Sequence, residues 1–299
     1  MKPSTPVDFL SLFQSLVASA INLGMFVLVV ILAICHRKRL REHWRIGLSL
    51  GVAVFLLALP AQVCGMLFFD LDAIFLQQGR PPPAGPAGNL MRFLVRFGLG
   101  IGFLIFVLQI GWTLLVYAVG AEVGDRESTP AYPVLRRKGP VRGLLLLAAF
   151  AGGGLFGAAS LFLFQALGVR EGEAVRRLLQ MFPGMADLDG TLLFFVTLTF
   201  VSAAAIGEEL SYRGVLQGWI RRIGGEGAGS LVAASVVPSL LWALLHLANT
   251  DAPLLKFGQI FVFGMILAAL ARRVNLEAAI CAHLGLNVCA AAVGFLFPT

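Results

Sequence analysis

Long apolar stretches follow one another along almost the whole chain, and they limit what it can fold into. A transmembrane helix needs about 20 mostly apolar residues. Lipid offers no partners for backbone polar groups, so such stretches must be helical unless they show the ten-residue alternation of a barrel. We expect an all-α, polytopic membrane helix bundle of about eight transmembrane helices. They cover approximately residues 8–35, 46–69, 93–120, 141–167, 191–218, 231–249, 257–272 and 275–297.

The charge content agrees with this interpretation and excludes two other classes. Charged residues make up 13% of the chain, against roughly 25% in soluble proteins. The net charge of +7 does not indicate a nucleic-acid-binding protein, because the basic residues form short clusters beside the apolar spans, as the positive-inside rule predicts. We therefore expect the lipid bilayer as a partner and no nucleic acid.

The basic clusters also predict the orientation and the organisation of the chain. They are densest in the first and third loops, which puts the odd-numbered loops in the cytoplasm and both termini outside. We expect four N-terminal transmembrane helices in 1–168, an interfacial or loop segment in 169–190, and a second group of transmembrane helices in 191–299. Within the middle segment, 169–182 predicts an amphipathic helix at the membrane interface. The proline-rich stretch 79–88 predicts a non-helical external linker.

Ionisable side chains inside the spans are confined to the second half of the chain. Such residues cost several kcal/mol each in lipid, and they usually mark a functional site. The first four spans have none at mid-depth. The later spans contain IGEELSYRG, LLWALLHLAN and ICAHLGLNV. These segments supply the candidate site residues Glu208, Glu209, Arg213, Trp242, His246, His283 and Asn287.

Helical spacing divides these residues between faces. Glu209 and Arg213 are four apart and can pair, whereas Glu208 lies about 100° round the helix from Glu209 and faces elsewhere. The Glu209–Arg213 pair has a purely structural interpretation as a salt bridge between helices, while Glu208 remains available for proton chemistry. His283 and Asn287, also four apart, share a hydrogen-bonding face. Counting along the helices places Glu208 and His283 at different depths, so tilted or offset helices are needed to bring them together.

The three motifs in this order resemble one family. EExxxR, an aromatic residue four positions before a His, and HxxxN on a final helix are similar to the CAAX prenyl-protease and bacteriocin-processing (Abi) family. Its members are intramembrane endopeptidases related to the Ras-converting enzyme. The resemblance covers roughly residues 190–297. The first-His motif of the family usually opens with Phe, where this chain has Trp242.

The resemblance implies a role for each residue. Glu208 would be the general base, and His246 its partner on the attacking water. His283 and Asn287 would stabilise the oxyanion. Glu209 and Arg213 would be structural or would position the substrate, and Trp242 would pack over the group that His246 contacts. The resemblance therefore implies a glutamate-type endopeptidase that needs no cofactor and acts on a membrane-associated peptide or protein.

Several alternatives remain open from the sequence. Glu208, His246 and His283 make a common ligand set for catalytic zinc, although HExxH is absent. Intramembrane Glu and His also occur in proton-coupled transporters, and some relatives act as non-catalytic bacteriocin-immunity proteins. The substrate is equally open between a CAAX-like tail, a leader peptide and a C-terminal sorting tail. A composition rich in Ala, Gly, Leu and Arg but poor in Lys indicates a bacterial plasma membrane.

Overall fold

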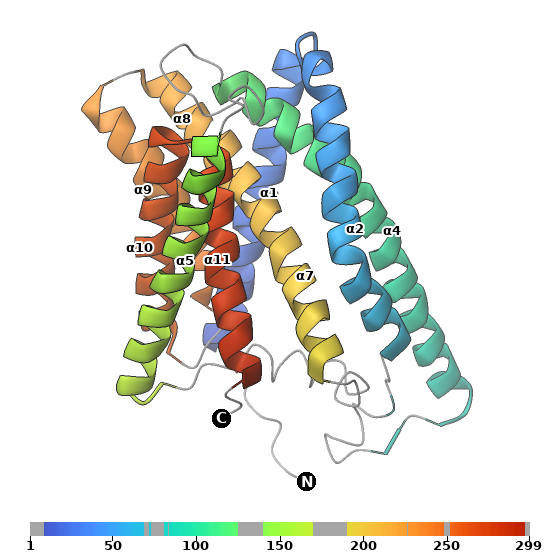
Figure 1. Ribbon diagram of the computed structural model, residues 1–299. Helices are drawn as coiled ribbons and strands as arrows, with labels where there is room; N and C mark the ends of the chain where they lie inside the picture. The colour runs from blue at the N-terminus through green and yellow to red at the C-terminus, as the bar shows by residue number, and fades with distance from the viewer. Residues whose placement is uncertain are drawn as a thin grey trace.

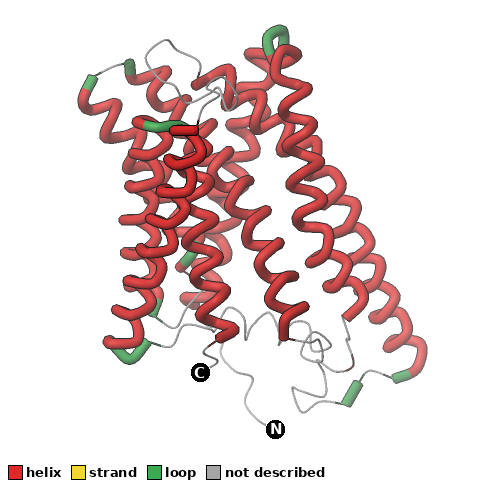
Figure 2. Tube along the Cα trace, viewed as in Figure 1, coloured by secondary structure: helices red, strands yellow, loops and turns green. Residues whose placement is uncertain are grey.

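The described part of the chain is helical throughout, apart from short connections. The computed structural model describes residues 9–68, 72, 81–82, 84–124, 140–169, 190–225, 227–247 and 252–296. All regular structure in these ranges is helix (Figure 2). The predicted all-α bundle is therefore confirmed. The amphipathic helix predicted at 169–182 cannot be compared with the structure, because residues 170–182 lie outside the described ranges.

The helices follow the predicted apolar stretches closely, and the fifth stretch forms one continuous rod from α7 through η3 to α8 (Figure 1). Two short connections separate the first two and the last two long helices. The elements are α1 (Phe9–His36), η1 (Leu40–His43), α2 (Trp44–Phe68), α4 (Gly85–Gly124), α5 (Pro140–Ala166), α7 (Gly190–Glu209), η3 (Leu210–Leu216), α8 (Gln217–Gly224), α9 (Ala228–Leu245), α10 (Pro253–Arg273) and α11 (Leu276–Leu296).

The bundle belongs to a multi-pass membrane protein. Within the described residues, six helices are long and apolar enough to cross a membrane, and shorter apolar segments lie at Trp44–Pro60 in α2 and Ile110–Val123 in α4. The long helices alternate in direction, so α1 begins and α11 ends at the same end of the bundle (Figure 1). The last turns of α8 and α10 carry basic pairs and lie at the opposite end.

The start of α4 corrects one sequence prediction. The stretch 79–88 was expected to be non-helical throughout, but α4 begins at Gly85 and includes Pro86. Proline is tolerated in a first turn because its missing N–H would have no helical acceptor there. Gly85 itself has a φ of 70°, which glycine adopts without strain. The expectation holds only for the described residues before Gly85.

Glycines bring helices from the two halves of the chain into close contact. A Cβ built at Gly153 of α5 would overlap the carbonyl oxygen of Ala282, and one built at Gly285 of α11 would overlap the carbonyl oxygen of Phe150. Of the three consecutive glycines at 152–154, Gly153 thus makes the closest backbone contact with α11. Helix α2 likewise packs on α7, so helices of 1–168 directly support those of 191–299. The division into these segments stays a prediction.

A cluster of charges, unforeseen from the sequence, links three elements at the basic end. Glu122 of α4 is largely buried and accepts a hydrogen bond of 3.1 Å from Arg39, with His36 Nδ1 at 3.5 Å. Arg222 of α8 donates to the Glu122 carbonyl oxygen at 2.9 Å. The cluster therefore ties α1 and α8 to the end of α4.

Candidate active site

The two adjacent glutamates lie where the backbone changes from α-helix to π-helix. Glu209 ends α7, and η3 begins at Leu210. The N–H of Gln217 bonds to the carbonyl oxygen of Tyr212, five residues earlier, which is the π-helical pattern, and such segments are frequent at functional sites. The Glu208 side chain is 30% exposed and that of Glu209 is 0% exposed. As helical spacing predicted, the two carboxylates lie in different environments.

Glu209 holds together a buried network. Its Oε1 accepts a hydrogen bond from Arg213 Nη1 at 3.1 Å, which confirms the predicted pair. The same oxygen lies 2.9 Å from His283 Nδ1 on α11, a contact that the sequence did not reveal. A carboxylate only accepts hydrogen bonds, so Nδ1 carries the proton. The other ring nitrogen, Nε2, then faces Glu208 Oε2 at 3.9 Å.

The positive charge of Arg213 is compensated inside the bundle. Its guanidinium lies over the Trp242 ring, with Cζ 4.6 Å from a ring centroid, and its Nη2 donates to the Gly264 carbonyl oxygen at 3.4 Å. Gln217 donates to the Ala268 carbonyl oxygen, one turn further along α10, at 3.1 Å. These two polar contacts attach the π-helix and the start of α8 to α10, and they help to fix the position of the segment that carries the glutamates.

Trp242 contacts both histidines and Glu208. It is completely buried on α9, and its Nε1 donates a 2.6 Å hydrogen bond to Glu208 Oε2. Its ring lies edge-on to the His246 ring at 5.1 Å and to the His283 ring at 5.0 Å between centroids. Trp242 therefore packs beside His246, and its hydrogen bond to the Glu208 carboxylate was not predicted. That it covers the group contacted by His246 stays a prediction.

His246 and Asn287 border this centre. His246 directly follows α9, and its Nδ1 lies 2.9 Å from the Trp242 carbonyl oxygen. Among the described residues, no hydrogen bond joins His246 to Glu208 directly. Asn287 lies one turn beyond His283 on α11, and its Nδ2 donates to the carbonyl oxygen of Val201 on α7 at 3.0 Å. Helices α7 and α11 are therefore in contact at two levels, at His283 with Glu209 and at Asn287 with Val201.

The zinc alternative depends on how close its ligands lie to one another. Within the described ranges, no group of three or more His, Cys, Asp and Glu side chains is placed to hold a metal ion. Both His246 and His283 direct Nδ1 to oxygen atoms, which leaves Nε2 of each ring as the nitrogen that would bind a metal. Glu208, His246 and His283 are not assembled as a three-ligand centre in this part of the chain, and a mechanism without a cofactor stays a prediction.

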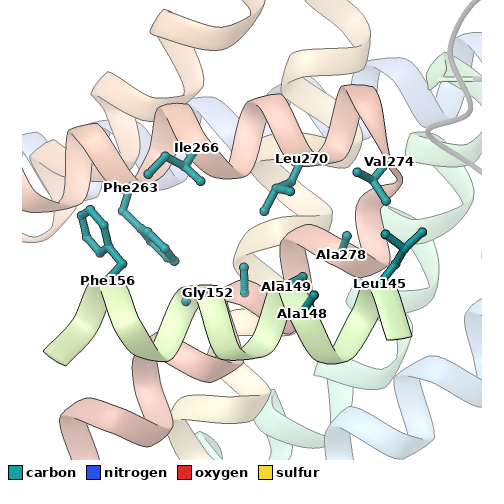
Figure 3. Close-up of a pocket in the computed structure, with 12 residues that line it drawn as sticks. Leu145, Ala148, Ala149, Gly152, Phe156, Phe263, Ile266, Leu270, Val274 and Ala278 are labelled. Carbon is teal, nitrogen blue, oxygen red and sulfur yellow. The ribbon is translucent and has the colours of Figure 1, made fainter. Parts of the chain in front are cut away.

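An apolar groove of about 350 Å³ lies close to the site, between α5, α10 and α11. It extends from Phe156 and Phe263 towards Val274, and almost all the side chains that line it are aliphatic or aromatic (Figure 3). Phe156 and Phe263 stack at one end with centroids 4.8 Å apart, and the Phe263 ring lies 6.3 Å from the His283 ring. One end of the groove therefore lies at Phe263, next to His283 of the polar cluster.

The segment that carries this cluster is similar to one known protein family. Residues 190–289 match the family model described as type II CAAX prenyl endopeptidase Rce1-like. The matched segment includes every candidate site residue from Glu208 to Asn287. No curated protein matches the chain, and no solved structure matches it.

Proposed function

Because residues 190–289 match the family model of Rce1-like type II CAAX prenyl endopeptidases, we propose that this protein is an intramembrane endopeptidase with Glu208 as its general base. One observation carries the assignment of the base. Of the two adjacent carboxylates, Glu209 is fully buried and occupied by Arg213 and His283, whereas Glu208 is partly exposed. Only Glu208 is accessible to water and to a substrate.

In the proposed reaction, Glu208 takes a proton from a water molecule that attacks the scissile carbonyl. It later gives this proton to the leaving amine, as general acid–base catalysis requires. His246 helps to hold the water. It has no direct hydrogen bond to Glu208 in the described structure, and a water molecule between the two side chains would connect them.

We propose that His283 and Asn287 stabilise the oxyanion. His283 already donates a hydrogen bond from Nδ1 to Glu209. To donate a second hydrogen bond from Nε2 to the oxyanion, the ring must be a protonated imidazolium. The Glu209 carboxylate, 2.9 Å from Nδ1, offsets this positive charge. The Asn287 amide has two N–H groups. One is directed to Val201, which leaves the second for the oxyanion. Donors of this kind contribute on the order of 100–1000-fold in rate each.

The proposed substrate is a membrane-associated peptide or protein. The glutamates lie on a helix that is long and apolar enough to cross a membrane, so the scissile bond would reach them from within or beside the bilayer. A CAAX-like tail, a leader peptide and a C-terminal sorting tail all meet this requirement. A bacterial plasma membrane is the proposed location, and the proposed mechanism uses no metal.

The test compares purified wild-type protein with Glu208→Gln, which keeps the size of the side chain and removes the base. Comparative proteomics of membrane-protein termini identifies the cleaved substrate, and its cleavage is then measured in proteoliposomes. We expect Glu208→Gln to lose at least about 100-fold in kcat while still inserting and folding. Glu277→Gln, a carboxylate in the first turn of α11, is the matched control and should stay active.

Two results would contradict the proposal. Undiminished cleavage by Glu208→Gln would exclude this residue as the base. Activity that disappears with a chelator and returns with zinc would exclude the metal-free mechanism. The same variant distinguishes a protease from an immunity protein or a transporter. If the protein acts without proteolysis, the wild-type protein has its phenotype although no cleaved substrate is found.

A further inference from the structure

The hydrogen bond between Trp242 and Glu208 joins α9 to the end of α7. At 2.6 Å between Nε1 and Oε2, it is slightly shorter than the usual range for an N–H···O bond. The indole N–H is a donor only, and Trp242 is completely buried. The Glu208 carboxylate, which we propose as the base, is therefore bound by a donor that has no access to bulk water as an alternative partner.

The Trp242 ring is itself fixed by its neighbours. The Arg213 guanidinium covers one ring face, and His246 and His283 pack against it edge-on. Phe263 adds a tilted contact with centroids 6.5 Å apart. A large planar side chain that is surrounded in this way has one rotamer available, because buried side chains pack without space for rotation. The position of its N–H is consequently set by the fold.

This fixed donor restricts the Glu208 carboxylate. The terminal torsion of a glutamate is broad and allows the carboxylate to rotate. With Oε2 bound to the indole and facing His283 Nε2 at 3.9 Å, the two oxygens become distinct. Oε1 is left as the oxygen that meets a water molecule. Holding a reacting group in one geometry is a large source of rate in enzymes.

We propose that Trp242 is a positioning residue that orients Glu208 through its indole N–H, so that one carboxylate oxygen is reserved for the attacking water. The inference rests on the proposed role of Glu208 as the base. It assigns to Trp242 a function that a phenylalanine at this position cannot perform, since a phenyl ring packs similarly but has no donor.

The kinetic test is Trp242→Phe, which keeps an aromatic ring and removes the N–H. We expect kcat to fall by about 10–100-fold, with KM changed by less than about twofold, because the substrate is bound by other groups. The matched control is Trp112→Phe on α4, whose ring stacks on Phe26 with centroids 5.4 Å apart. A merely structural role for Trp242 would instead lower the thermal stability or raise KM, and would leave kcat of the folded fraction unchanged.

A second readout needs no substrate. Labelling with 15N-tryptophan gives one indole N–H resonance for each of the four tryptophans, and Trp242→Phe identifies the resonance of Trp242. We expect Glu208→Ala to shift this resonance and to leave that of Trp112 in place. An unmoved resonance, or full kcat in Trp242→Phe, overturns the positioning role. A wild-type protein that cleaves nothing while the resonance shifts overturns the proposed function instead.

Discussion

At the scale of single residues, Glu209 differs from its neighbour in what it contacts. Glu208 is partly open and bonded to one tryptophan, whereas Glu209 is sealed between Arg213 and His283. Both hydrogen-bond contacts of Glu209 use Oε1, and its Oε2 has no partner among the described residues. Replacing either glutamate should therefore have different consequences for stability and for catalysis.

We predict that Glu209→Gln loses both stability and activity. The substitution leaves the buried Arg213 without its counter-charge, and breaking such a pair typically costs about 3–5 kcal/mol. It also replaces the carboxylate that orients His283 with a neutral amide, whose oxygen is a weaker acceptor for His283 and Arg213. Thermal unfolding in detergent, measured beside Glu208→Gln, checks this prediction. Equal melting temperatures for the two variants would show that Glu209 does not have the structural role described.

The same scale shows where the sequence was insufficient. The spacing of Glu209 and Arg213 predicted their pairing, because both partners lie on one helix. The spacing of His283 and Asn287 gave a shared face but not their partners, which come from α7. Contacts between helices depend on how the helices are offset, and periodicity within one segment carries no information about that offset.

At the scale of helices, the close contact of α5 and α11 positions His283. Ala282 and Gly285, on either side of it, meet the backbone of α5 with no room for another carbon atom. Small residues at helix crossings allow backbones to approach closely in membrane proteins. A helix from the first half of the chain thereby fixes the height and rotation of the helix that carries a proposed oxyanion donor.

We predict that Gly153→Ala destabilises the protein and reduces cleavage. Its methyl group would overlap the Ala282 carbonyl oxygen, so α11 must move away, and overpacking of this kind costs about 1–3 kcal/mol. Gly152→Ala is the matched control, since a Cβ there meets nothing within 4 Å. Thermal unfolding and cleavage rates of the two variants check the prediction. Similar behaviour of both would refute a role for the close contact.

Helix positions were predictable because lipid demands long apolar segments, and every predicted stretch corresponds to helix in the structure. The π-helix was not predictable, since the residues of 210–216 fit an α-helix equally well. Glu122 was missed for a related reason. It lies just beyond the predicted stretch 93–120, and its partners come from separate parts of the chain.

At the scale of the whole molecule, the cluster around Glu122 joins helices that are distant in sequence. Arg39 is 69% exposed and Arg222 is 28% exposed, whereas the Glu122 side chain is 9% exposed. Exposed ion pairs contribute only about 0–1 kcal/mol each. The stabilising effect should therefore depend on the buried carboxylate more than on any single cation.

We predict that Glu122→Gln lowers the melting temperature more than Arg39→Ala does. The glutamine leaves Arg39 and Arg222 close together without a compensating charge, whereas loss of Arg39 leaves the contacts of Glu122 with Arg222 and His36 in place. Cleavage by the folded fraction should stay near the wild-type rate, because the cluster lies at the basic end of the bundle. A melting temperature that falls equally in both variants would contradict the larger contribution of the buried carboxylate.

The π-helix also bears on how the gene can change in length. Its bonds span five residues instead of four, so the segment accommodates an extra residue between the glutamates and Gln217, which is anchored to α10. Deleting one codon between 210 and 216 would therefore close the segment to an α-helix with little rotation of its two sides. Deleting one codon from the regular helix between Val201 and Glu208 would instead turn Glu208 by about 100° relative to the part of α7 that Asn287 contacts. A change of length is thus tolerated in the π-helix and not in the α-helix before it.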